Sequence, residues 1–106
     1  MIEEMKSKIL SLNDLIEYND DAIVSKIIVN SEKGSITIFA FDEGQGLSEH
    51  TAPFDATVQI IEGEAEIIIS EESFKLSMGK MIIMPANKPH AVKSITKFKM
   101  ILTMIK

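Results

Sequence analysis

Short segments rich in β-branched and aromatic residues follow one another from residue 20 onward, and each ends in a turn. The turns contain Gly, Pro, Asn, Asp or Ser and recur about every 8–12 residues or closer. This spacing is typical of an all-β sandwich or barrel rather than of βαβ units. By these signals we count about ten strands, and the clearest segments are 23–29, 35–41, 47–52, 56–61, 65–69, 73–76, 81–84, 90–93 and 97–105.

The start of the chain is the only part compatible with a helix. Three of its apolar residues have the i, i+3, i+4 spacing of one helix face, namely Leu12, Leu15 and Ile16. Ser11 precedes them and could cap a short turn. The chain of 106 residues has the length of one domain. We therefore expect a single domain, with a short helical or irregular extension over residues 1–19 and a barrel over residues 20–106.

Composition excludes several functions. The net charge is -5 and no three Lys or Arg residues are consecutive, whereas binding to phosphates needs a basic surface. No apolar stretch approaches the roughly 20 residues that cross a bilayer. The first residues are acidic where a secretory leader is basic, and the absence of cysteine excludes disulfides and thiolate chemistry. We expect a cytoplasmic protein that binds neither nucleic acid nor membrane.

Apolar residues occupy one face of some predicted strands and both faces of others. Ala65, Ile67 and Ile69 alternate with other residues as one face of a half-buried strand. Segments 56–61 and 81–84 are instead apolar on both faces. Two packed sheets with irregular strand ends would explain this, and so would a sheet whose outer face is covered by a second subunit. We favour the second explanation and expect a homodimer.

The two histidines lie in two stretches with regular spacing of glycine, histidine and proline. The first stretch has Gly44, His50 and Gly63, and the second has Gly79, Pro85 and His90. In order and spacing, these stretches resemble the two motifs of the cupin family, and the match is closest to small single-domain bacterial cupins of the cupin 2 conserved barrel type. The resemblance covers roughly residues 8–106. It implies an all-β double-stranded β-helix, the RmlC-like jelly-roll barrel.

The chain departs from the family pattern at four motif positions. Ala52 stands for the second histidine, Ala56 for the ligand glutamate, Asn87 for a glycine and Ser94 for the final asparagine. A full cupin site resembles a clamp of three histidines and one carboxylate for a divalent ion such as Zn, Fe, Mn or Ni. The motif is therefore degenerate at two of its four ligand positions.

A metal site at His50 and His90 would be weak and incomplete. Two neutral imidazoles leave the whole charge of a divalent ion uncompensated, and catalytic zinc usually has three protein ligands. Water, a substrate or Gln59 would have to complete the shell. We expect a barrel pocket that binds a small molecule, with a divalent metal held weakly if at all. The alternative for these histidines is a role as hydrogen-bonded walls of the pocket.

The remaining candidate ligand-binding residues are Gln59, Phe54 and Met84. Gln59 faces outward if its neighbours at positions 58 and 60 face inward, and a bulge near Asp55 would reverse this. Phe54 could form the rim of the pocket, or it could simply pack. The methionines are expected to line the core and pocket, since thioethers fill irregular gaps, and a copper site of methionine and histidine is a minor alternative.

Two other classes of function remain open. One is an enzyme, such as a metal-dependent isomerase, lyase or dioxygenase, with His50 or His90 as base or metal ligand. The other is a non-catalytic regulatory module that uses the fold for dimerisation. The cupin resemblance does not choose between these classes, because one fold hosts many activities.

Overall fold

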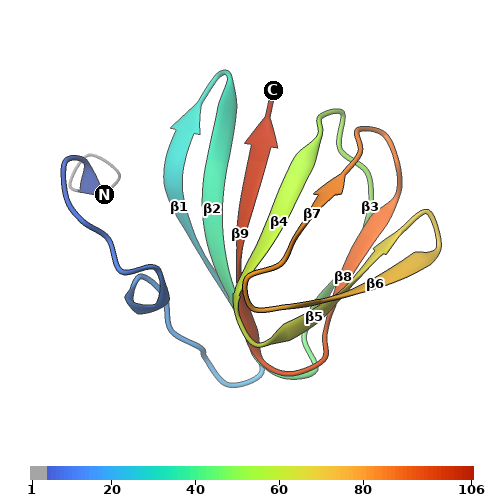
Figure 1. The fold of residues 1–106 in the computed structure, drawn as a ribbon, viewed down its shortest axis with the longest axis horizontal. Helices are drawn as coiled ribbons and strands as arrows, with labels where there is room; N and C mark the ends of the chain where they lie inside the picture. The colour runs from blue at the N-terminus through green and yellow to red at the C-terminus, as the bar shows by residue number, and fades with distance from the viewer. Residues whose placement is uncertain (1–4) are drawn as a thin grey trace.

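The computed structural model describes residues 5–106, which form two antiparallel sheets packed face to face (Figure 1). The predicted all-β class is confirmed, and the described residues contain nine strands rather than about ten. These are β1 (Ile23–Ser31), β2 (Gly34–Phe41), β3 (Gly46–His50), β4 (Ala56–Glu62), β5 (Glu64–Ile69), β6 (Glu72–Ser77), β7 (Met81–Met84), β8 (His90–Ser94) and β9 (Phe98–Ile105). The acidic residues of the start of the chain that argued against a leader lie at 3 and 4, outside the described residues.

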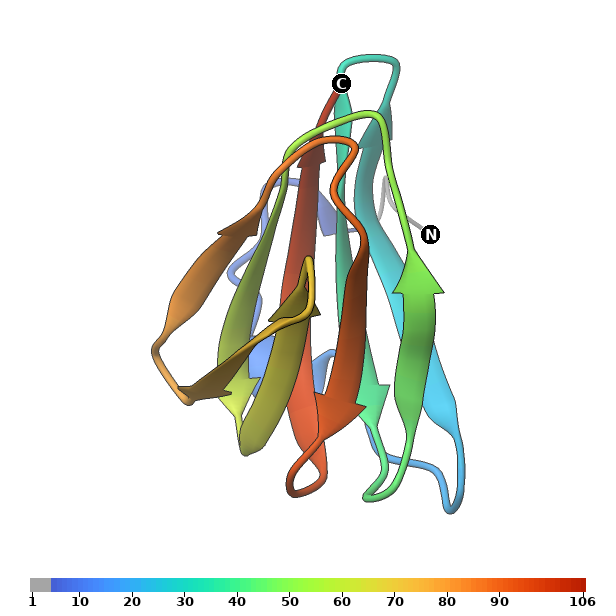
Figure 2. The ribbon, with the colours of Figure 1, turned by 90° about the vertical axis from the view of Figure 1, so that its right-hand side faces the viewer.

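The strands are ordered as in a jelly roll. The five-stranded sheet has the order β1-β2-β9-β4-β7, and the four-stranded sheet has the order β3-β8-β5-β6. The chain passes between the sheets repeatedly, so strands distant in sequence become neighbours, and Figure 2 shows the two layers from the side. Within residues 5–106, no helix is both long enough and apolar enough to cross a membrane.

The N-terminal segment lies against the outer face of the five-stranded sheet. Met5 is helical, and a single turn of 3-10 helix follows at η1 (Leu12–Asp14), where the Ser11 side chain makes no capping hydrogen bond. Ile16 is buried against Ile38 and its neighbours in a second apolar cluster outside the sandwich interior. Lys99 Nζ donates to the Asn13 carbonyl at 2.7 Å. The extension is thus mostly irregular, and tertiary contacts hold it in place.

One end of the interior between the sheets is solidly packed. The rings of Phe41 and Phe98 stack with centroids 4.5 Å apart, and both side chains are fully buried. Gly63, in the turn from β4 to β5, has φ +77 and lies so close to β9 that a Cβ would be 2.2 Å from the Lys97 carbonyl oxygen. Only glycine fits this turn, because L side chains both clash there and disfavour positive φ.

Candidate functional site

A β-bulge turns His50 toward the interior. In the pairing of β3 with β8, Leu47 lies opposite Val92 and His50 lies opposite His90, so β3 has one residue more than β8 over this interval. Without the bulge, strand alternation would place Leu47 and His50 on opposite faces. The extra residue puts both on the inner face, where His90 and Val92 already lie.

The two imidazoles contact each other edge to face. Their centroids are 4.3 Å apart and their planes are inclined by 72°. His90 is 4% exposed, whereas His50 is exposed to solvent. The pair therefore reaches from the buried interior to the surface.

Backbone carbonyls fix which ring nitrogen carries the proton. Nδ1 of His50 lies 2.7 Å from the Ser48 carbonyl oxygen, and Nδ1 of His90 lies 3.1 Å from that of Lys88. A carbonyl oxygen can only accept, so Nδ1–H donates in each case. In the neutral rings, the lone pair is then on Nε2, which is free to accept a hydrogen bond or bind a metal.

Burial lowers the pKa of His90 below its ordinary value of 6.5. The hydrogen bond to the Lys88 carbonyl opposes this shift, and the proximity of His50 reinforces it. The net shift of the pKa is downward because the loss of water around the charged ring destabilises it more than one hydrogen bond to a carbonyl stabilises it. His90 is therefore a neutral imidazole near neutral pH.

Both histidines line a cavity of about 360 Å³ between the sheets. Its lining comes from both sheets and the connection after β3: Phe39, Leu47, His50, Ala52, Ala56, Met84, His90, Val92, Met100, Leu102 and Met104. The polar side chains among these residues are the two imidazoles. The four positions at which the family places its ligands thus converge on one cavity, with alanine at two of them.

The loop before His90 is tied to the segment after β3. The amide of Asn87 donates to the Ala52 carbonyl at 2.7 Å, and the amide of Ala86 donates to Asp55 Oδ1 at 2.8 Å. Asn87 has φ 64, a left-handed conformation that asparagine tolerates better than most residues. This explains physically why asparagine can replace the motif glycine.

Ser94 retains a structural role at the far end of β8. Its Oγ accepts a hydrogen bond from the Gly44 amide at 2.7 Å, and its own amide donates to the Gln45 carbonyl at 3.1 Å. Gly44 has φ +88. Ser94 therefore anchors the turn before β3, which starts the strand that carries His50.

The predicted ligand-binding residues divide into two groups. His50, His90 and Met84 line the cavity, whereas Gln59 and Phe54 are not among its lining residues. Gln59 is exposed on the outer face of β4, because no register shift falls within residues 56–60 and alternation with the buried Val58 and Ile60 is regular there. The ring of Phe54 instead lies 5.8 Å from Lys106 Nζ. The assignment of these two residues to the pocket is therefore corrected.

Sequence reasoning did not identify the apolar walls contributed by Phe39, Leu47, Val92 and Leu102. Strand alternation could have grouped Phe39 with other inward residues of β2. Nothing local indicates which end of the sandwich is hollow, since that depends on side-chain volumes from strands distant in sequence.

The described residues do not fit the complete metal site of a cupin. Residues 5–106 contain no cluster of three or more His, Cys, Asp or Glu that could hold a metal ion. The places of the missing histidine and glutamate are taken by Ala52 and Ala56, whose methyl groups cannot bind a metal. No catalytic step through a divalent metal is therefore assigned to this pocket.

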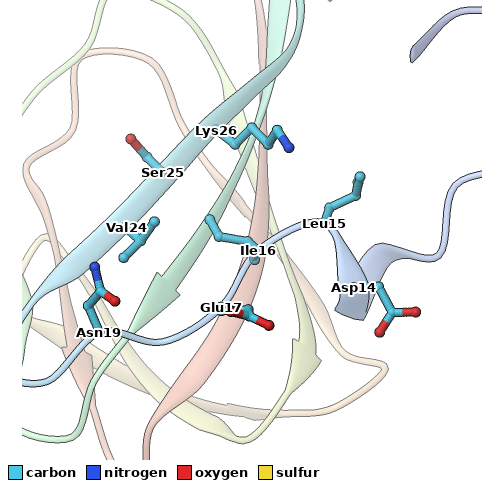
Figure 3. A pocket seen from close by; sticks show the side chains of 8 residues that line it. All are labelled: Asp14, Leu15, Ile16, Glu17, Asn19, Val24, Ser25 and Lys26. Carbon is cyan, nitrogen blue, oxygen red and sulfur yellow. The ribbon is translucent and has the colours of Figure 1, made fainter. Parts of the chain in front are cut away.

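A second concavity lies between the N-terminal segment and β1 (Figure 3). It measures about 520 Å³, and its walls include the exposed side chains of Asp14, Glu17 and Lys26. Ile16 packs with Val24 at its base. The histidine cavity is the better candidate site, because its polar groups converge within an apolar enclosure.

Comparison with known proteins identifies the class of protein. The cupin domain family model matches residues 37–106, and the fold and the converging motif positions agree with it. The chain belongs to the cupin family. No curated protein matches it.

The solved structures that are similar over most of this chain include the following three. A conserved protein of unknown function from Streptococcus pyogenes has 36% identity and a TM-score of 0.90, covering 94% of this chain and 88% of that one. A cupin superfamily protein from Desulfitobacterium hafniense has 28% identity and a TM-score of 0.89, covering 94% and 92%. A cupin 2 conserved barrel domain protein from Leptotrichia buccalis has 36% identity and a TM-score of 0.86, covering 89% and 46%.

Proposed function

We propose that this protein binds a small, mainly apolar molecule in the barrel cavity, with the polar end of that molecule at His50 and His90. The observation that carries the proposal is the convergence of these imidazoles at one side of an otherwise apolar enclosure. Ligand pockets commonly combine apolar walls with a few convergent polar groups. A volume of about 360 Å³ suits a molecule the size of a substituted benzene.

The tautomers select the polar group of the ligand. Nε2 of each imidazole is an acceptor in the neutral form of the ring, because Nδ1–H is donated to a carbonyl. A hydroxyl or an N–H group satisfies such an acceptor, whereas a carboxylate would place oxygen lone pairs against a nitrogen lone pair. No lysine or arginine is among the lining residues to offset a buried anion. The expected ligand is therefore an alcohol, phenol or amine-like donor with an apolar body.

Titration with para-cresol and its carboxylate analogue para-toluate tests this proposal. The chain has two histidines, so their imidazole resonances are easily assigned by NMR. We expect para-cresol to shift both near neutral pH, and para-toluate to bind roughly tenfold more weakly because an acceptor is left unsatisfied. Ala56→Leu, which takes up part of the cavity, should weaken binding, whereas Gln59→Ala on the outer face should not. The proposal would be contradicted if para-cresol left the imidazole chemical shifts unchanged. It would also be contradicted if A56L bound para-cresol as tightly as the wild type.

We also propose that the protein acts in the cytoplasm as a homodimer. Within residues 5–106, β7 is an edge strand with a hydrogen-bonded neighbour on one side only. Its outward side chains Met81 and Ile83 are 57% and 56% exposed. Pairing with a second copy would cover both the open edge and these apolar side chains. Light scattering should give a dimer mass that Ile83→Lys converts to a monomer mass; a monomeric wild type would exclude this assembly.

A further inference from the structure

Two thioethers flank the position at which Ala56 replaces a carboxylate. Ala56 on β4 pairs with Met84 of β7 on one side and with Met104 of β9 on the other. Paired residues of neighbouring strands project from the same face of a sheet. All three line the cavity that His50 and His90 border from the opposite sheet. Two imidazoles and two thioethers therefore line the part of the cavity next to Ala56, where the family has its carboxylate ligand.

This donor set suits a soft monovalent ion. Thioethers and imidazoles are ligands of Cu(I), whereas Mg, Ca and Mn prefer oxygen ligands, which no side chain in the lining supplies. All four donors are neutral, so a bound ion keeps its full charge inside an apolar enclosure. The cost of burying an ion rises steeply with its charge, and a monovalent ion therefore pays far less than a divalent one.

The histidines are already oriented as metal ligands usually are. A metal-bound histidine commonly donates its other ring N–H to a carbonyl or carboxylate, which fixes the ring. Nδ1 of His50 and of His90 each make such a contact with a backbone carbonyl. Met84 is buried and Met104 half-buried, and the three rotatable bonds of a methionine side chain let its sulfur adjust to an ion.

We propose that the histidine side of the cavity binds one Cu(I) ion through Nε2 of His50 and His90 and through the sulfur atoms of Met84 and Met104. This inference goes beyond the proposed function by giving the same cavity a second kind of occupant, and it rests on that function only in requiring a cavity open to ligands. The thioethers take the place of the absent carboxylate and change the preferred ion from divalent to monovalent.

Anaerobic titration of the untagged full chain with Cu(I), against bicinchoninate as the competing chelator, tests the inference. We expect one equivalent of Cu(I) to be retained, with sulfur and nitrogen neighbours in its X-ray absorption spectrum. Met84→Leu combined with Met104→Leu should weaken binding by about tenfold or more and remove the sulfur signal, because leucine keeps the volume but not the donor. His50→Gln should weaken binding similarly.

The matched control is Met78→Leu, since Met78 is 68% exposed and does not line the cavity. It should retain wild-type Cu(I) binding and the sulfur signal. Circular dichroism of each variant verifies that it is folded. Failure of the wild type to retain Cu(I), or an unchanged sulfur signal in the double methionine variant, would overturn the inference.

Para-cresol titration of the same samples separates this inference from the proposed function. If para-cresol binds while Cu(I) is not retained, the copper inference is wrong and small-molecule binding stands. If neither binds, both are wrong. Both are supported if the wild type retains Cu(I), the double methionine variant loses the sulfur signal, and para-cresol competes with Cu(I) for the site.

Discussion

Strands β4 and β9 run from a solid end of the interior to a hollow end. At the solid end, Phe41 and Phe98 stack with centroids 4.5 Å apart and Ile60 is almost fully buried. At the hollow end, the same two strands present Ala56 and Met104 to a cavity of about 360 Å³. The two strands are paired at both ends, with a register shift between Ile60 and Glu62 at the solid end, and the side chains that they present to the interior differ in volume. Side-chain volume therefore decides which end is a core and which is a pocket.

Irregular backbone occurs at both ends: the solid end has the register shift between Ile60 and Glu62, and the hollow end has two irregular features beside the site. The bulge in β3 and the left-handed Asn87 both border the histidines. Such features are common next to functional sites, where they re-aim side chains. The solid end supplies stability, and the hollow end holds the two imidazoles edge to face.

Truncating one large side chain at each end gives the largest expected contrast. Phe98→Ala should lower the free energy of unfolding by about 3–5 kcal/mol, because it opens a void in a filled core. Met104→Ala should cost about 1 kcal/mol, because Met104 is half-buried and already borders a cavity. Urea unfolding followed by circular dichroism measures both. Equal losses would mean that the two ends are packed alike.

Enlarging one buried alanine at each end reverses the test. Ala65→Leu at the solid end should cost about 1–3 kcal/mol by overpacking. Ala56→Leu should change the free energy of unfolding by less than about 1 kcal/mol, since the cavity accepts the added methyl groups. Both alanines are buried, so exposure does not confound the pair. A56L as destabilising as A65L would show that the hollow end has no room.

The left-handed turn before His90 should tolerate some substitutions better than others. Asn87→Ala should cost about 1 kcal/mol because alanine disfavours positive φ, whereas Asn87→Gly should be close to neutral. Thermal unfolding of the two variants gives the comparison. If alanine and glycine behave identically at this position, φ is not what selects the residue.

Acidification should affect the hollow end through His90, with the smallest effect of the four. Its pKa is lowered in the folded protein, so the unfolded chain binds the proton more readily. The free energy of unfolding should therefore fall as the pH drops through about 6.5 and level off below the folded pKa. His50 is the titratable group that faces it.

His90→Gln is the control for this prediction. Its unfolding free energy should decline less over the same pH range, because the group that protonates on unfolding is gone. Urea midpoints of both proteins across that range measure the difference. A wild-type decline no steeper than that of H90Q would contradict the assignment to His90.

Local sequence alone predicts most of the fold. Every predicted strand segment overlaps an observed strand, since β-branched residues and turn residues act over a few positions. The resemblance to the cupin motifs implied that positions 50, 52, 56 and 90 share a site, and all four line one cavity. The helix pattern of Leu12, Leu15 and Ile16 was less informative: the structure has one turn of 3-10 helix at Leu12–Asp14, and Ile16 packs against the sheet instead.

The tertiary structure decided which way the side chains of the site residues point and which residues are their neighbours. The inward direction of His50 depends on a bulge that exists only when β3 pairs with β8, and the outward direction of Gln59 depends on regular pairing over residues 56–60 of β4. Met84 and Met104 flank Ala56 because three strands far apart in sequence are in register. The sequence determined which side chains the chain carries and where its strands lie. Strand pairing, which joins distant residues, decided which of those side chains meet in the cavity.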